Sequence, residues 1–167
     1  MRSIEKLVSI GSEALGTPLG AMPEFLERWR LGPELFELLK LRNGFYAFES
    51  ALHVFPITED SGSGLEGWNA EPLWRCEYGE CTQGLLFFAE DIFQDQFCLR
   101  EDGVFRFYAE TGETALLAPS IEAWAELILD DYREQTGWPL AHDWQAANGP
   151  LPRGKRLMPK IPFVLSG

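Results

Sequence analysis

The chain changes its hydrophobic period twice, from a helical spacing to a strand spacing and back. Apolar residues three or four positions apart predict a helix within residues 3–15. Pro23 and Pro33 each open a further short helix, because the first helical turn has no use for the N–H that proline lacks. Gly44 follows these helices and suits a left-handed C-cap. The first quarter of the chain is therefore predicted to be helical.

Short runs of aromatic and branched residues then predict four strands, at 45–49, 52–56, 85–88 and 114–118. The stretch between the second and third runs contains prolines and glycines and is expected to be irregular. Ser120 is a good N-cap for a last helix that ends near Gly137. The apolar face of this helix is formed by Ile121, Trp124, Ala125, Ile128 and Tyr132.

Residues 97–107 have the pattern of a β-hairpin with a turn at Asp102-Gly103. A three-residue loop, Glu101 to Gly103, sets Leu99 opposite Phe105 and gives one continuous apolar face, whereas a two-residue Asp102-Gly103 loop sets Leu99 opposite Arg106. We therefore predict the longer loop, a type I turn with Gly103 in the left-handed position of a bulge.

The length and composition fit a single domain over residues 1–167, in which residues 150–167 form a basic, extended C-terminal segment. The 46% of hydrophobic residues can build a core without disulfides. Three cysteines, an odd number, and a start without an apolar signal run favour a reducing, cytoplasmic setting. No apolar run approaches about 18 residues, so no membrane span is expected.

The net charge of -12 argues against direct nucleic-acid binding, which needs Lys and Arg to neutralise phosphate, and is more compatible with a basic protein partner. All 26 acidic residues precede Pro150, whereas the tail beyond it is basic and has no acid. We expect this tail to fold back onto the acidic body, with contact to another copy as the alternative. Its apolar end, Ile161 to Leu165, is interpreted as a strand or a packed extended segment.

Motifs of cofactor chemistry are weak in this chain. The glycines from Gly62 to Gly67 match a dinucleotide-binding pattern, but Pro72 and Gly79 break the helix that should follow them. Cys76 and Cys81 lack a second pair of zinc ligands. We therefore expect no cofactor and no metal, and interpret the cysteines as buried, unreactive thiols.

An acidic stretch before the hairpin is the main candidate site. Glu90, Asp91 and Asp95 have no basic neighbour along the sequence until Arg100, and Gln96 follows them. They are interpreted as a solvated rim that contacts a partner. Paired carboxylates for acid–base catalysis on a small substrate are the alternative.

Three further side chains are ambiguous from the sequence. His53 alternates into a strand outside any nucleophile motif and is interpreted as structural. Trp68 and Trp74 lie in the irregular middle, where they serve either as anchors for a protein partner or as core residues. We include both tryptophans among the candidate partner-binding residues.

The motifs of this chain together resemble the SUKH superfamily, which includes the Smi/Knr-like regulators of fungal cell-wall synthesis and many bacterial immunity proteins. The similar segments are LRNGFYAFESALHVFP at 41–56, GWN at 67–69, LLFFAEDIFQDQFCL at 85–99, VFRFYAETGE at 104–113 and SIEAWAELILDDY at 120–132. One departure is Gln94-Asp95, where such proteins often have Gly-Asp.

The resemblance implies an α+β fold, with a mixed, mainly antiparallel sheet packed against helices. It also implies binding without catalysis. In bacteria, the implied role is that of an immunity protein that neutralises a toxin, such as a nuclease, by direct contact. A housekeeping regulator or scaffold of the same fold is a further alternative, because fold alone does not decide function.

Overall fold

The computed structural model describes residues 1–59 and 64–166. A single sheet lies at its centre, and its strands follow the order of the chain, so that each strand pairs with the next. Every pairing in the described part is antiparallel, which confirms an α+β fold with a sheet packed against helices. The strands are β1 (Phe45–Ala47), β2 (Leu52–Val54), β3 (Leu86–Glu90), β4 (Gln96–Arg100), β5 (Gly103–Phe107) and β6 (Thr114–Ala118).

Helices precede, interrupt and follow these strands. They are α1 (Ser3–Ser9), α2 (Glu24–Glu27), α3 (Gly32–Leu41), α4 (Leu65–Trp68), the short 3-10 helices η1 (Arg75–Glu77) and η2 (Gly79–Thr82), α5 (Ile121–Asp130), α6 (Tyr132–Thr136), α7 (Trp138–Asn148) and α8 (Phe163–Ser166). The glycine pattern of the sequence begins at Gly62, outside the described residues.

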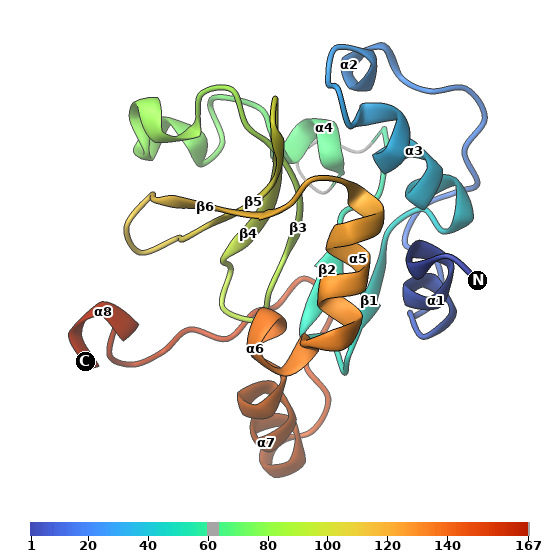
Figure 1. Ribbon diagram of the computed structural model, residues 1–167. Coiled ribbons are helices and arrows are strands. Elements are labelled where there is room, and N and C mark those ends of the chain that lie inside the picture. Colours follow the sequence, from blue (N-terminus) through green and yellow to red (C-terminus); the bar gives the residue numbers. More distant parts are fainter. Residues whose placement is uncertain (60–63, 167) are drawn as a thin grey trace.

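The two faces of the sheet are covered by different parts of the chain. Helix α5 lies across one face with α1 and α3 beside it (Figure 1). The Trp124 ring of α5 packs against Phe88 and Phe97. The other face is covered by the irregular segment that links β2 to β3. Trp74 of this segment packs edge-on against Phe87 of β3. Both faces are thus buried, and every residue of β3 and β5 is buried with them.

Helix α5 begins where the sequence predicts a helix. The Ser120 hydroxyl accepts a hydrogen bond from the backbone N–H of Ala123 at 3.0 Å, the geometry of an N-cap. Helix α6 continues the chain after α5 and ends at Gly137, which has a left-handed φ of 72°. Helix α7 was not predicted from the sequence, because only Ala141 in it is buried and its apolar periodicity is weak.

The predicted register of the β4–β5 hairpin is wrong. Arg100 pairs with Gly103 and Leu99 with Val104, so the loop has two residues, Glu101 and Asp102. Gly103 does not have a positive φ. The prediction assumed one apolar and one polar face, whereas both faces of this hairpin are buried and either register would place apolar side chains in the core.

Glycine is required at position 103 for a steric reason instead. A Cβ there would lie 2.6 Å from the backbone oxygen of Ala118 in β6. The close approach of β6, and not a left-handed turn, therefore explains this glycine.

The C-terminal segment folds back along the body, as expected, but it is not a strand. Residues 151–162 run past the β3–β4 turn, and α8 follows as a short helix that lies apart from the other helices (Figure 1). The Glu110 carboxylate accepts the backbone N–H groups of Phe163 and Val164 at 2.8 and 3.0 Å. The N–H groups at the start of a helix have no partner within the helix, and an acid can accept them.

The backbone of the turn between β3 and β4 leads to a prediction about Gln94. Gln94 has a φ of 71°, where a side chain is strained and glycine is not. Replacing Gln94 by Gly should raise the free energy of unfolding, measured with urea, by about 0.5–1 kcal/mol. The control is Gln83→Gly, at an exposed position with an ordinary φ of -66°, which should lower it. Equal destabilisation by both changes would show that the left-handed backbone at Gln94 carries no strain.

Candidate functional site

Asp91 organises the turn that joins β3 to β4. Its Oδ1 accepts the backbone N–H groups of Phe93 at 2.8 Å and Asp95 at 3.0 Å. Its own backbone N–H donates to the Asp95 carbonyl at 2.8 Å. An Asp side chain that bonds to backbone two residues further on is a common way to fix a tight turn. The carboxylate is therefore part of the framework of the turn.

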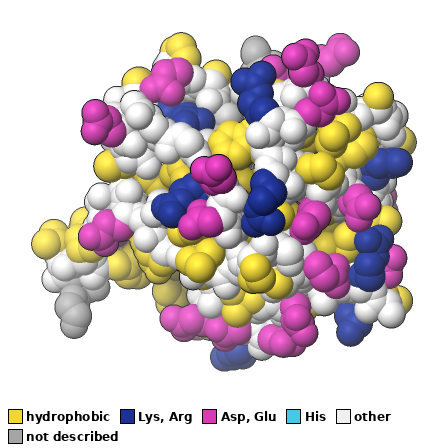
Figure 2. Space-filling view, turned by 45° about the horizontal axis from the view of Figure 1, so that its top comes forward, with side chains coloured by type: hydrophobic (Ala, Val, Ile, Leu, Met, Phe, Trp, Pro, Cys, Tyr) yellow, Lys and Arg dark blue, Asp and Glu magenta, His cyan; other side chains and the backbone are white. Residues whose placement is uncertain are grey.

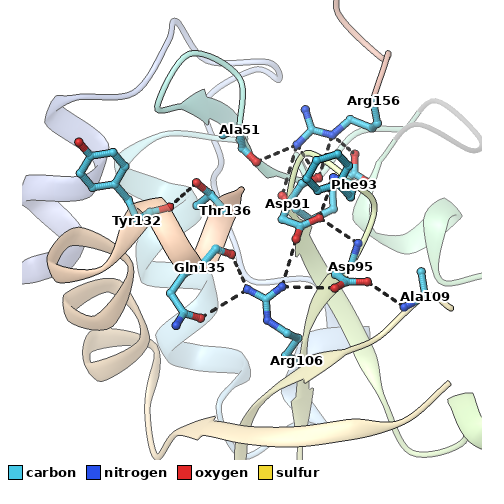
Figure 3. Close-up of polar contacts among 11 residues, drawn as sticks. Ala51, Asp91, Phe93, Asp95, Arg106, Ala109, Tyr132, Gln135, Thr136 and Arg156 are labelled. Carbon is cyan, nitrogen blue, oxygen red and sulfur yellow. Dashed lines mark hydrogen bonds and ion pairs between the residues drawn. The ribbon is translucent and has the colours of Figure 1, made fainter. Parts of the chain in front are cut away.

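Arg106 lies opposite this turn and supplies a positive charge. It extends from β5, and its Nη1 lies 3.1 Å from Asp91 Oδ2 and 3.6 Å from Asp95 Oδ2 (Figure 3). Its Nη2 donates to the Gln135 carbonyl in α6, and its guanidinium stacks over the Phe97 ring. One arginine thus joins β3, β5 and α6.

The protonation of Asp91 reflects this burial. Removal from water, together with the nearby Asp95 carboxylate, raises the pKa of Asp91 to about 7, while Arg106 and the hydrogen bond from Phe93 act in the opposite direction. Burial also raises the pKa of Asp95. The folded state therefore retains a proton on Asp91 at pH values where the unfolded chain has lost it, and the contribution of this group to stability is lost as pH rises through about 7.

A second arginine, Arg156, comes from the C-terminal segment. Its Nε lies 3.3 Å from Glu90 Oε1, and its guanidinium donates to the carbonyls of Ser50, Ala51 and Asp91 at 2.6, 3.1 and 2.8 Å. The side chain is only 4% exposed. The tail is thus fixed to the body by a buried cation that neutralises a buried acid.

The carbonyls that bind Arg156 include one from a strained turn. Phe48, Glu49 and Ser50, between β1 and β2, have φ values of 53°, 53° and 69°. Left-handed backbone costs roughly 1–2 kcal/mol at a residue other than glycine. Such a turn persists only when its surroundings hold it, and the Arg156 hydrogen bond to Ser50 is one such contact.

His53 completes the polar cluster at this end of the sheet. Its Nδ1 lies 3.0 Å from Glu90 Oε1, across the pairing of β2 with β3. Its ring stacks on Tyr46 with 4.4 Å between the ring centroids. We call this set of side chains the arginine–carboxylate network; its members are His53, Glu90, Asp91, Asp95, Arg106 and Arg156.

The remaining candidate residues are packed into the structure. Gln96 is 5% exposed, and its Oε1 accepts the indole N–H of Trp68 at 2.7 Å. The indole N–H of Trp74 donates to the Trp68 carbonyl at 2.9 Å. Both tryptophans are half-buried against the core. Their contacts therefore fit the core interpretation better than that of free anchors.

The structure corrects the expectation of a solvated, unpaired acidic rim. Glu90 and Asp91 are 6% and 5% exposed, and each is paired with an arginine. Their partners are distant in sequence, which is why the acids looked isolated. The one available signal was Arg106 itself, a charged residue within an otherwise apolar strand. Asp95 is more exposed, since a quarter of its side chain reaches solvent.

The cysteines also differ from expectation. Cys98 is buried, and burial raises the pKa of its thiol to about 12, so it is unreactive as predicted. Cys76 and Cys81, however, are exposed, because the η1–η2 segment covers the sheet with its aromatic side chains and turns the thiols outward. Within residues 1–59 and 64–166, no group of three or more His, Cys, Asp or Glu side chains could hold a metal ion.

Within the arginine–carboxylate network, Asp91 has a structural role. Both of its carboxylate oxygens accept hydrogen bonds from the protein, and the residue is 5% exposed. A general base must come within reach of a substrate proton. The burial of Asp91 therefore weakens the alternative of catalysis by this carboxylate.

The substitution expected to change stability most is that of Arg156. Replacing Arg156 by Ala leaves Glu90 buried without its cation, and should lower the free energy of unfolding by about 3–5 kcal/mol. The matched control is Arg153→Ala, in the same segment but exposed, which should change it by less than about 0.5 kcal/mol. Urea unfolding at pH 7 measures both. A similar, small effect of the two substitutions would contradict the buried ion pair.

No protein-family model, curated protein or solved structure matches this chain in comparisons with known proteins. The comparisons therefore lend no function to the site.

Proposed function

We propose that this domain is a non-enzymatic protein-binding module of the bacterial immunity type, which neutralises a basic toxin domain, such as a nuclease, by direct contact in the cytoplasm. One observation supports this most. In the buried network, Glu90 and Asp91 are matched by Arg106 and Arg156, so the net charge of -12 is carried by the other side chains. An outward negative field of this size attracts a basic protein and raises the rate of association.

The exposed acids include a group at the meeting point of two loops. The Tyr78 hydroxyl, between η1 and η2, donates to the Ala109 carbonyl beyond β5 at 2.6 Å, which brings the two loops together. We define the acidic face by the exposed acids of these loops: Glu77, Glu80, Glu110 and Glu113. Burial and the charges of Glu77 and Asp95 raise the pKa of Tyr78, in keeping with a negative local potential.

The negative charge of the acidic face is not neutralised by a basic side chain of the same two loops. Arg75, the base of the η1–η2 segment, has its guanidinium turned inward to the carbonyls of Asn69, Thr82 and Leu85. Burial lowers its pKa. Acidic side chains are seen over much of the surface in Figure 2, with arginines and lysines between them. The acidic face is thus the part that we propose to meet the partner first.

Two further observations are compatible with this proposal. No helix in the described part of the chain is long and apolar enough to cross a membrane. The exposed thiols of Cys76 and Cys81 are free, which fits a reducing compartment. Catalysis on a small substrate by Asp91 is less favoured, because its carboxyl group is 5% exposed and hydrogen-bonded by the protein.

The proposal predicts a salt-dependent association with a basic partner. The assay measures binding kinetics to the C-terminal domain of the protein encoded immediately upstream, or to a partner purified with the tagged domain from its native cells. Replacing Glu77 and Glu80 by Lys should slow association by about tenfold or more at low salt, with less difference at high salt. Co-expression should relieve the toxicity of such a partner.

The control makes the same change of charge on another face of the domain. Glu126 and Asp130 are exposed on α5, on the opposite side of the sheet, and their replacement by Lys should slow association by less than about threefold. If both pairs of substitutions slow association equally, the acidic face is not the contact surface. If no basic protein binds the unaltered domain, the proposed function is wrong.

A further inference from the structure

A pocket of about 520 Å³ opens where the C-terminal segment crosses the end of the sheet. Its aromatic wall runs from Tyr46 through His53 and Phe55 to Trp68, with each ring in contact with the next. The C-terminal segment contributes Arg153, Gly154 and Arg156 to the lining. The Gly154 N–H donates to the Tyr46 hydroxyl at 3.1 Å, which closes this side.

The floor of the pocket has a defined pattern of donors and acceptors. The Glu90 carboxylate faces the Arg156 guanidinium and acts as a hydrogen-bond acceptor. The contact between His53 Nδ1 and Glu90 is therefore an N–H donation from the histidine, and the tautomer that makes this donation carries its lone pair on Nε2.

Two acceptors remain available there. Glu90 Oε1 is used by His53 and Arg156, whereas neither Glu90 Oε2 nor His53 Nε2 has a hydrogen-bond partner within the part of the chain that is described. Both atoms remain in contact with solvent. Both side chains line the pocket. A ligand with an N–H or O–H group can satisfy them.

The mouth of the pocket carries a positive charge. Arg153 lines it, is exposed, and forms no ion pair with any described residue. Because Arg156 and Glu90 neutralise one another, Arg153 leaves the pocket cationic in a chain whose net charge is -12. Such a local reversal of charge favours an anionic group at this end.

We propose that this pocket binds a small planar aromatic molecule that has an N–H or O–H donor at one end and a carboxylate or phosphate at the other. The ring lies between the aromatic wall and the C-terminal segment, where flat contact with aromatic side chains is favourable. The donor points to His53 Nε2 and Glu90 Oε2. The anion lies at Arg153. The volume and the mixture of apolar walls with few polar groups are those of small-molecule sites.

The test uses three probes and the intact chain. 4-Hydroxybenzoate has both the donor and the anion, 4-methoxybenzoate lacks the donor, and 4-cresol lacks the anion. Nuclear magnetic resonance titration follows the Trp68 indole N–H and the His53 ring signals. 4-Hydroxybenzoate should bind with a dissociation constant on the order of 1 mM or tighter, and about tenfold more tightly than either of the other probes.

Variants assign each difference to its residue. Arg153→Ala should remove most of the advantage of 4-hydroxybenzoate over 4-cresol and leave its advantage over 4-methoxybenzoate. His53→Asn retains a donor towards Glu90 but removes the Nε2 acceptor, and should reduce the advantage over 4-methoxybenzoate. The control, Arg133→Ala on α6, should alter neither, because Arg133 is not among the residues that line the pocket.

Two results would overturn the proposal: no change in the Trp68 and His53 signals with any probe at about 10 mM, or equal affinities for all three probes in the unaltered protein. The probe comparison in the unaltered protein requires no variant to fold. The outcome is also independent of the acidic face, so a failure here leaves the proposal of protein binding in place.

Discussion

The fold depends on the pairing of two buried carboxyl groups with arginines from distant parts of the chain. Glu90 and Asp91 lie at the end of β3, where the sheet is covered on both faces. A buried ion is costly unless it is paired and hydrogen-bonded. Arg106 arrives from β5 and Arg156 from the C-terminal segment, so the requirement at one turn fixes the positions of two remote segments.

This requirement accounts for the division of charge along the sequence. The basic tail provides Arg156 to the buried network and Arg153 to the mouth of the adjacent pocket. Beyond these residues the tail is a mostly exposed, apolar protrusion, seen at the left of Figure 2. The acids of the body, by contrast, remain largely at the surface. The same chain can therefore have a closed, charge-balanced interior and a strongly negative exterior, which is the property that the proposed protein binding uses.

The sequence predicts most of the elements but little of the site. Local signals suffice for the strands and for the Ser120 helix, since alternation, N-caps and turn residues act over a few positions. The hairpin register fails because Leu99 can face an apolar layer on either side of the sheet. The pairing of Asp91 with Arg106 and of Glu90 with Arg156 spans 15 and 66 residues, and no local pattern encodes it. Three left-handed residues in succession, from Phe48 to Ser50, are likewise set by contacts from elsewhere.

The coupling between Asp91 and Arg106 is the most direct measure of whether these acids hold the fold together. A double-mutant cycle with Asp91→Asn and Arg106→Met, followed by urea unfolding, isolates the energy of this pair. At pH 8, above the pKa of about 7 for Asp91, the ionised pair should couple by about 2–4 kcal/mol, and the coupling should fall at pH 5, where the carboxyl is protonated. A coupling below about 0.5 kcal/mol at both pH values would contradict the account and return Asp91 to the candidates for direct function.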